Sequence, residues 1–239
     1  MWRLFVVVPC LTACADPEPP RCVEDGETAC FRGVFRKLLG GTVEGVRVCA
    51  PQQNDIACVT SDVDGGWKMP GLPLDEDVYL TARHEDGVPA LFPQNTTHDD
   101  YGWYKVVVPP SIMELHANRL DVSLNPERGH VLFLVWEGLN WDGVDTPNVP
   151  DVSVRVLDGP ADVFYSDALG LASDRLEVTS GSGAGGLLNV KPGTVRLRFK
   201  GPQGTCKRHM FHYAMDETGA FDVPIRAGFT TAIDVRCAP

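Results

Sequence analysis

The sequence predicts an all-β protein with two tandem β-sandwich domains, and three observations lead to that prediction. Among the 239 residues are 24 glycines and 19 prolines, so turns interrupt the chain too often for long helices. Several short runs alternate apolar and polar residues, which is the period of a half-buried strand, and no window of a dozen residues keeps a helical period. Strands and glycine-rich turns also follow one another in the same order in both halves of the chain.

The chain begins with the features of a secretory signal. Arg3 is basic, residues 4–11 form an apolar run, and small residues follow it before the expected cleavage point. Such a run is far shorter than the roughly 20 residues that a transmembrane helix needs. We therefore predict a signal peptide over residues 1–13.

Leu11-Thr12-Ala13-Cys14 resembles the lipobox of bacterial lipoproteins. The resemblance implies cleavage before Cys14, acylation of that cysteine, and contact with the membrane through the lipid alone. Ala15 directly follows Cys14 and resembles the residue that directs a lipoprotein to the outer membrane under the enteric sorting rule. We therefore expect an outer membrane lipoprotein of the cell envelope. An ordinary signal peptide with a chance cysteine is the alternative. Residues 14–27 form a lipidated N-terminus and a Pro-rich, extended linker.

The charge of the chain limits its partners. There are 21 basic and 32 acidic residues, which gives a formal net charge of −11. An acidic protein repels phosphate backbones and anionic headgroups. We therefore predict no nucleic-acid partner.

The cysteines predict a disulfide framework. Cys10 leaves with the signal and Cys14 is acylated, and an even number remains in an exported chain. No C-x-x-C spacing indicates a metal site. Fifteen pairings are possible for six cysteines, and proximity in the sequence favours Cys22–Cys30, Cys49–Cys58 and Cys206–Cys237.

The first half contains a series of predicted strands before a break. Residues 120–124 are predicted as the last of them, because Leu120, Val122 and Leu124 alternate with polar residues. Residues 125–129 form a turn-rich break, so the predicted domains are 28–126 and 127–239. The other predicted strands are 29–35, 46–48, a return strand from Cys58, a short strand near Trp67, 78–83 and 104–108.

The second half repeats this plan. The clearest strand is 194–200, where three apolar residues are predicted to face inward and three basic residues outward. The other predicted strands are 131–136, 152–156, 164–165, a short strand at 187–190, 221–225 and 230–237.

The repeat can be aligned by its turns. Val46-x-Val48 precedes Thr60-Ser61, Gly65-Gly66 and Gly71-Leu72-Pro73. In the same order, Val154-x-Val156 precedes Thr179-Ser180, Gly185-Gly186 and Lys191-Pro192-Gly193. This order predicts an internal duplication of about a hundred residues, the size of a small sandwich.

Three segments resemble the carboxypeptidase regulatory-like domain: Gly45-Val46-x-Val48, Thr60-x-Asp62-x-Asp64-Gly65-x-Trp67 and Leu72-Pro73. The resemblance covers residues 28–125 and implies an immunoglobulin-like or transthyretin-like (prealbumin-like) β-sandwich. Residues 129–237 fit more loosely, because a glycine-rich segment replaces the acidic turn. The family is a scaffold and binding module, so the resemblance supplies no catalytic residues.

Three motifs suggest metal or cofactor binding, but a structural role is the better interpretation of each. Asp62-x-Asp64-Gly65 begins like a calcium loop and lacks the later Glu, so a hairpin turn is expected. Gly181-x-Gly183-x-x-Gly186 fits a dinucleotide pattern, but no helix can follow before Pro192. Cys206, His209 and His212 lie three residues apart, which on a strand places neighbours on opposite faces. We therefore predict no metal and no cofactor.

Tyr101, Trp103 and Trp141 are the candidate ligand-binding residues. They lie close to acidic residues in the sequence, as in sites where rings stack on sugars while carboxylates accept hydroxyl protons. The favoured alternative is that these aromatic rings pack in the core. Asn95-Thr96-Thr97 is a glycosylation sequon, expected here to be only a polar loop.

The predicted function follows from location and fold. The sequence has no G-x-S-x-G or H-E-x-x-H motif, so we predict that the protein is not an enzyme. We expect a non-enzymatic cell-envelope lipoprotein that acts as a binding, adhesion or assembly module. The alternatives are a carbohydrate-binding surface lipoprotein and an accessory subunit or domain of an exported hydrolase.

Overall fold

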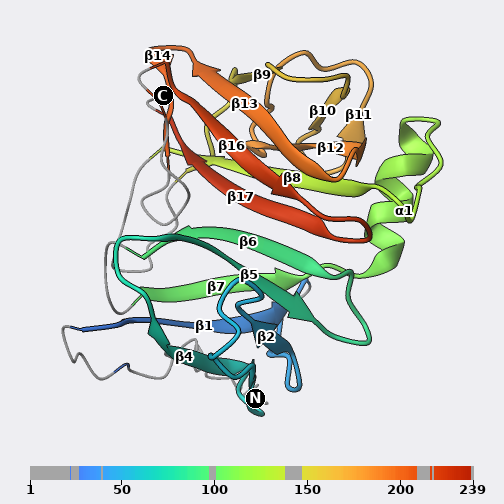
Figure 1. The fold of residues 1–239 in the computed structure, drawn as a ribbon. Helices are drawn as coiled ribbons and strands as arrows, with labels where there is room; N and C mark the ends of the chain where they lie inside the picture. Colours follow the sequence, from blue (N-terminus) through green and yellow to red (C-terminus); the bar gives the residue numbers. More distant parts are fainter. Residues whose placement is uncertain are drawn as a thin grey trace, which may run out of the picture.

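The computed structural model describes residues 22, 27–38, 40–96, 101–137, 147–208, 216 and 218–237. For 101–104, 205, 207 and 208 it describes the backbone alone. Within these residues the chain forms seventeen strands and one helix, so the predicted all-β fold class is confirmed. Figure 1 shows the strands stacked in layers, with the first half of the chain below the second.

The first half forms two sheets that face each other across a hydrophobic core. In one sheet β1 lies between β4, which runs antiparallel to it, and β7, which runs parallel. In the other, the order is β3-β2-β5-β6, all antiparallel. The strands are β1 (Ala29–Lys37), β2 (Arg47–Cys49), β3 (Val59–Thr60), β4 (Gly66–Leu72), β5 (Asp77–Arg83), β6 (Ala90–Asn95) and β7 (Tyr101–Val107).

The second half repeats these pairings. β8 lies between antiparallel β12 and parallel β17, as β1 lies between β4 and β7. β9, β13 and β16 pair in the manner of β2, β5 and β6. The strands are β8 (Gly129–Trp136), β9 (Ser153–Val156), β10 (Val163–Ser166), β11 (Ala172–Ser173), β12 (Ala184–Val190), β13 (Gly193–Gly201), β14 (Gly204–Thr205), β15 (Lys207–Arg208), β16 (Ala220–Ile225) and β17 (Thr230–Arg236).

The repeat extends to individual hydrogen bonds. The Ser61 hydroxyl accepts the N–H of Val46 at 2.9 Å and donates to a carbonyl three residues before Val46. The Thr179 hydroxyl accepts the N–H of Val152 at 3.0 Å and donates to a carbonyl three residues before Val152. Val46 therefore corresponds to Val152, two residues earlier than the alignment of the two halves by sequence predicts.

The glycines of the two turns correspond in the same way. Gly65 and Gly183 have positive φ, +74° and +63°, and each carbonyl accepts a backbone N–H at 2.9 Å, from Phe35 and Val135 respectively. A Cβ on either glycine would lie 2.5 or 2.6 Å from the carbonyl oxygen of that same partner. Glycine is therefore required at both positions, and the structural equivalent of Gly65 is Gly183 rather than Gly185.

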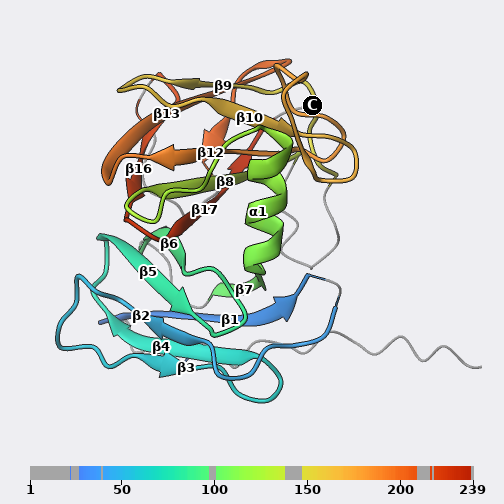
Figure 2. The same ribbon diagram turned by 90° about the vertical axis from the view of Figure 1, so that its right-hand side faces the viewer.

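The sequence did not predict the helix α1 (Pro110–Arg119). Pro110 opens it at the position where proline needs no N–H partner. Met113, His116 and Ala117 are its buried residues, at the three- and four-residue spacing of one helix face. With ten residues, the helix is shorter than the window over which a helical period is recognisable. In Figure 2, α1 lies along one side of the molecule between the two halves.

The prediction of a strand over 120–124 is wrong. The carbonyl of Ala117 accepts the N–H groups of both Leu120 and Val122, so these residues terminate the helix. Asp121 has a φ of +54°, which is incompatible with a strand, and Val122 is 37% exposed. The apolar alternation here arises from a helix end and not from a sheet.

The two halves share one sheet. β17 pairs in parallel with β6, Thr230 opposite Ala90 and Thr231 opposite Leu91, as Figure 1 shows for the adjacent strands. One sheet therefore runs in the order β11-β10-β12-β8-β17-β6-β5-β2-β3. The predicted domain boundary, between 126 and 127, lies in the segment that connects α1 to β8.

Three disulfides are present, and the pairs are those that sequence proximity favours. Cys22–Cys30 attaches the linker to β1, and Cys49–Cys58 joins the end of β2 to the segment before β3. Cys206–Cys237 joins the end of β17 to the segment after β14. The Cα atoms lie 6.0, 4.4 and 4.3 Å apart, respectively, near the range that disulfides require.

Candidate functional site

The structure describes the candidate aromatic residues only in part. Tyr101 and Trp103 occupy alternate positions of β7, opposite Phe31 and Gly33 of β1, and their side chains are outside the description. Trp141 lies outside the described residues altogether, as does Cys14. The ligand-binding role of the three aromatic residues therefore stays a prediction.

Described side chains of the first half contact those of the second half in the zone where β5, β6 and β7 meet β8 and β17. We call this zone the seam. An ion pair joins the last strands of the two halves there, between Lys105 of β7 and Asp234 of β17. Trp136 donates its indole N–H to the other carboxylate oxygen of Asp234 at 3.4 Å, and Lys105 Nζ lies 5.6 Å from the Phe92 ring centre. The Lys105 and Asp234 side chains are 17% and 20% exposed, so solvent screens this pair only in part.

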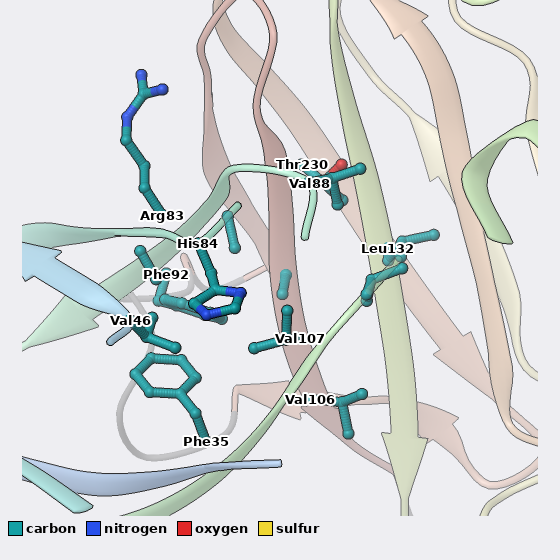
Figure 3. A pocket seen from close by; sticks show the side chains of 14 residues that line it. Phe35, Val46, Arg83, His84, Val88, Phe92, Val106, Val107, Leu132 and Thr230 are labelled. Atoms are coloured by element: carbon teal, nitrogen blue, oxygen red, sulfur yellow. The ribbon is translucent and has the colours of Figure 1, made fainter. Parts of the chain in front are cut away.

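The seam also contains a cavity of about 40 Å³, shown in Figure 3. Phe35, Val46 and Phe92 line it from the first half, and Leu132 and Thr230 line it from the second. This volume accommodates a few water molecules at most, and the walls are largely apolar. The cavity is therefore too small for a sugar ring.

Two arginines contact one aromatic ring at the edge of the seam. Phe229 is 3% exposed and lies in the turn between β16 and β17. The guanidinium carbon of Arg83, the last residue of β5, lies 4.4 Å from its ring centre, and that of Arg226 lies 4.9 Å from it. In Figure 3 the Arg83 side chain extends away from the apolar residues of the cavity. The next residue, Thr230, donates its N–H to the carbonyl of Pro89 at 2.8 Å, which attaches this turn to the first half.

Two buried histidines have structural roles. His116 Nδ1 accepts the N–H of Ala172 at 3.1 Å, and this bond attaches α1 to β11. Burial, followed by the nearby Arg119 guanidinium, lowers the His116 pKa. His130 Nδ1 accepts the N–H of Asn189 at 3.2 Å, and burial lowers its pKa as well. Both bonds require the neutral ring, because a protonated imidazole has no acceptor nitrogen.

The acidic segment that begins like a calcium loop is a hairpin turn. Asp62 Oδ1 accepts the N–H groups of Asp64 at 3.0 Å and Gly66 at 2.8 Å, so the turn itself uses that oxygen. Asp167 accepts the corresponding N–H groups two and four residues later, and Asp216 does the same. Among the described residues there is no group of three or more His, Cys, Asp or Glu that could hold a metal ion.

The other two motifs have structural explanations. Gly181 and Gly183 precede β12, a strand, so the helix that a dinucleotide site requires does not follow. Cys206 is bonded to Cys237, and His209 and His212 lie outside the described residues. The site residues that sequence reasoning missed are Arg83, Arg226 and Phe229. Arg226 and Phe229 lie in one turn, and the pairing of β6 with β17 brings this turn to Arg83.

Comparison with known proteins identifies no family. No family matches the sequence, and no curated protein resembles it closely enough to count as a relative. Among solved structures, the minor pilin of Streptococcus agalactiae aligns with 88% of this chain and 97% of its own at 14% identity, with a TM-score of 0.27. The TIE protein of Bacillus anthracis aligns with 88% of this chain and 34% of its own at 10% identity and a TM-score of 0.26.

A shaft pilin from Lactobacillus rhamnosus GG aligns with 89% of this chain and 99% of its own at 9% identity, with a TM-score of 0.27. Scores and identities this low establish neither a shared fold nor a shared function. Separately, none of the helices in the described part of the chain is long and apolar enough to cross a membrane.

Proposed function

We propose that this chain is a non-enzymatic lipoprotein of the cell envelope, attached to the outer membrane by acylated Cys14, whose joined halves act as a binding, adhesion or assembly module. The observation that carries the proposal is the set of three disulfides, which form and persist in oxidising compartments. They support export, and Leu11-Thr12-Ala13-Cys14 supports a lipid as the means of retention. Each buried methylene of an acyl chain contributes about 0.8 kcal/mol, so two or more chains anchor a protein stably.

The seam supports a module of fixed shape. A continuous sheet, the Lys105–Asp234 ion pair and the Phe229 turn all connect the two halves. A fixed arrangement of two halves suits a protein that presents a surface to a partner, because less conformational freedom is lost on binding. The resemblance of residues 28–125 to the carboxypeptidase regulatory-like domain, a scaffold and binding module, agrees with this role.

Metabolic labelling tests the anchor. Cells that express the wild type, Cys14→Ser or Cys10→Ser are grown with a labelled fatty acid, and extracts are partitioned with a nonionic detergent. We expect the wild type and Cys10→Ser to carry label and enter the detergent phase, and Cys14→Ser to lose both properties. Partition of Cys14→Ser into detergent, or an unlabelled wild type, would show that Cys14 is not the anchor.

The second candidate function is carbohydrate binding through Tyr101, Trp103 and Trp141. It is favoured by the position of β7 at the edge of its sheet, with Tyr101 and Trp103 at alternate positions. A glycan array with the wild type, Trp103→Ala and Trp141→Ala tests it. We expect a wild-type signal that both variants reduce at unchanged melting temperature, and a wild type that binds no glycan would contradict it.

A further inference from the structure

Two positive charges converge on Phe229 although the chain is strongly acidic, with a formal net charge of −11. The guanidinium carbons of Arg83 and Arg226 lie 4.4 and 4.9 Å from its ring centre, so they are no farther apart than the sum of these distances. At such a separation like charges repel. A contact with a ring face uses none of the five N–H donors of a guanidinium, so these donors remain available.

A third arginine adds to this charge. Arg47 of β2 lies directly opposite Arg83 of β5 in the antiparallel register, a position where like charges are unfavourable. Its guanidinium donates to Cys58 Sγ at 3.6 Å, a weak contact. Because the Arg47 guanidinium lies at Cys58 and those of Arg83 and Arg226 lie at Phe229, we use the term arginine site for Arg83 and Arg226 together with the Phe229 ring.

The arginine site has no carboxylate partner within the described part of the chain, in contrast to Arg119 and Arg196. Arg196 forms ion pairs with both Asp216 and Asp222, and Arg119 forms one with Asp167. None of the ion pairs found in the described residues involves Arg47, Arg83 or Arg226. Within the described residues, Arg47, Arg83 and Arg226 therefore have no carboxylate at ion-pair distance.

The backbone beneath the arginine site is fixed before any ligand binds. In the turn, the Phe229 N–H donates to the Arg226 carbonyl at 3.1 Å, and the Gly228 N–H donates to the Arg128 carbonyl at 2.9 Å. A Cβ on Gly129 would lie 2.7 Å from the Arg226 carbonyl oxygen, so this backbone packs closely against β8. Arg83 ends β5, which pairs with strands on both sides. Preorganised donors reduce the cost of binding.

We propose that the arginine site binds an oxyanion, a carboxylate or a phosphate, carried by a small ligand. Guanidinium forks match the paired oxygens of such groups, and an anion placed between Arg83 and Arg226 relieves their mutual repulsion. This inference goes beyond the proposed function, because it assigns a ligand chemistry to a site that involves neither Cys14 nor the aromatic residues of β7.

The ligand must be small because acidic side chains lie beside the site. Glu85 and Asp86 are exposed and follow Arg83 by two and three residues. An extended polyanion or an anionic membrane would bring further negative charge over these carboxylates. A compact group with one or two oxyanions reaches the arginines without that repulsion.

Calorimetric titration of the full-length protein in nonionic detergent micelles tests the proposal. The probes are inorganic phosphate and succinate, each compared with chloride at equal ionic strength and neutral pH. We expect saturable binding of at least one of the two oxyanions and none of chloride. We also expect Arg83→Gln and Arg226→Gln each to weaken that binding at least tenfold.

Matched variants separate the site from general charge effects. Arg155→Gln removes an exposed arginine of the second half, and we expect binding within twofold of the wild type. Phe229→Leu retains apolar bulk but removes the ring face, and we expect weaker binding at an unchanged circular dichroism spectrum. Titration of the arginine Nε–H resonances of the wild type with phosphate provides a readout that needs no variant.

Several results would overturn the proposal. They are equal responses to chloride and to both oxyanions, an Arg155→Gln variant as weak as Arg83→Gln, or wild-type Nε–H resonances that phosphate does not shift. Binding to anionic phospholipid vesicles without binding of free phosphate or succinate would replace the small ligand by a membrane surface. The labelling test of Cys14 is independent of all these results, so either proposal can fail alone.

Discussion

Lys105 in the last strand of the first half forms an ion pair with Asp234 in the last strand of the second half, 129 residues later in the chain. Both side chains are mostly shielded from water, and the indole of Trp136 also donates to the Asp234 carboxylate. The pair therefore stabilises the arrangement of the halves as well as the strands themselves. Removal of one partner breaks this ion pair while the other charge stays largely shielded from water.

We predict that Asp234→Ala lowers the free energy of unfolding by about 1–3 kcal/mol, between the values typical of exposed and of fully buried pairs. The double variant Lys105→Met/Asp234→Leu should recover part of that loss, because no uncompensated charge remains. Urea unfolding of the single and double variants measures both effects. A double variant no more stable than Asp234→Ala would show that the Lys105 charge left behind causes none of the loss.

The disulfides should differ in their contribution to stability. Cys206–Cys237 closes a loop with a sequence separation of 31, and Cys49–Cys58 closes one of 9. The loop-entropy relation gives about 3.7 kcal/mol for the longer loop and about 2.6 kcal/mol for the shorter one. Paired Cys→Ser variants, compared by urea unfolding, should show the larger loss for Cys206 and Cys237. The reverse order would indicate that strain or residual structure outweighs loop entropy.

Strands with one buried face were predictable from the sequence. In β13, Val195, Leu197 and Phe199 are at most 2% exposed while Lys200 is exposed, as the alternation predicts. β6 was missed because it contains Pro93 and because Leu91 to Asn95 are buried on both faces, so its sequence carries no alternation. The period-two signal exists only where one face of a strand meets water.

The arginine site could not be predicted from the sequence, because Arg83 reaches the turn of Arg226 and Phe229 only through tertiary pairing. Arg83 and Phe229 are 146 positions apart and come together only after β17 adds to β6. The equivalence of Ser61 and Thr179 could have been recognised in the sequence, because each of these hydroxyl residues lies four positions before the turn glycine. The order of turns showed the repeat, but its register became clear only from the hydrogen bonds of these hydroxyls and of the turn glycines.

Mild acid should destabilise the protein through His116 and His130. Burial lowers the pKa of both imidazoles below 6.5 in the folded state, so the unfolded chain binds more protons at pH 5 to 6.5. The stabilisation is fully present above pH 6.5 and is lost as the pH falls through the folded pKa values. Around His116 the Arg119 charge strengthens this effect and the Asp167 charge opposes it.

Urea midpoints measured from pH 7.5 to 5.0 test this expectation. The midpoint of the wild type should fall over this range, which lies above the usual pKa of carboxyl groups. The double variant His116→Gln/His130→Gln should be less stable at pH 7.5 but should show a flatter dependence. A wild-type midpoint that does not change with pH would mean that neither histidine is held in its neutral form.

The final prediction concerns the turn glycines that the two halves share. Alanine at Gly65 or Gly183 would combine a positive φ with a Cβ at 2.5 or 2.6 Å from a carbonyl oxygen, so the backbone itself must move. Gly159 is the matched control, because its φ is +84° and no atom lies within 4 Å of the position that a Cβ would take there. The control substitution should cost only the left-handed strain, about 1–2 kcal/mol.

Urea unfolding should therefore show a loss for Gly65→Ala and for Gly183→Ala at least twice that for Gly159→Ala. Similar losses at Gly65 and Gly183 would also support their structural equivalence. Alanine at Gly65 displaces β1, and alanine at Gly183 displaces β8, the equivalent strand of the second half. If Gly183→Ala costs no more than Gly159→Ala, the close approach to Val135 does not constrain the turn. The register of the repeat would then depend on the Ser61 and Thr179 hydroxyls alone.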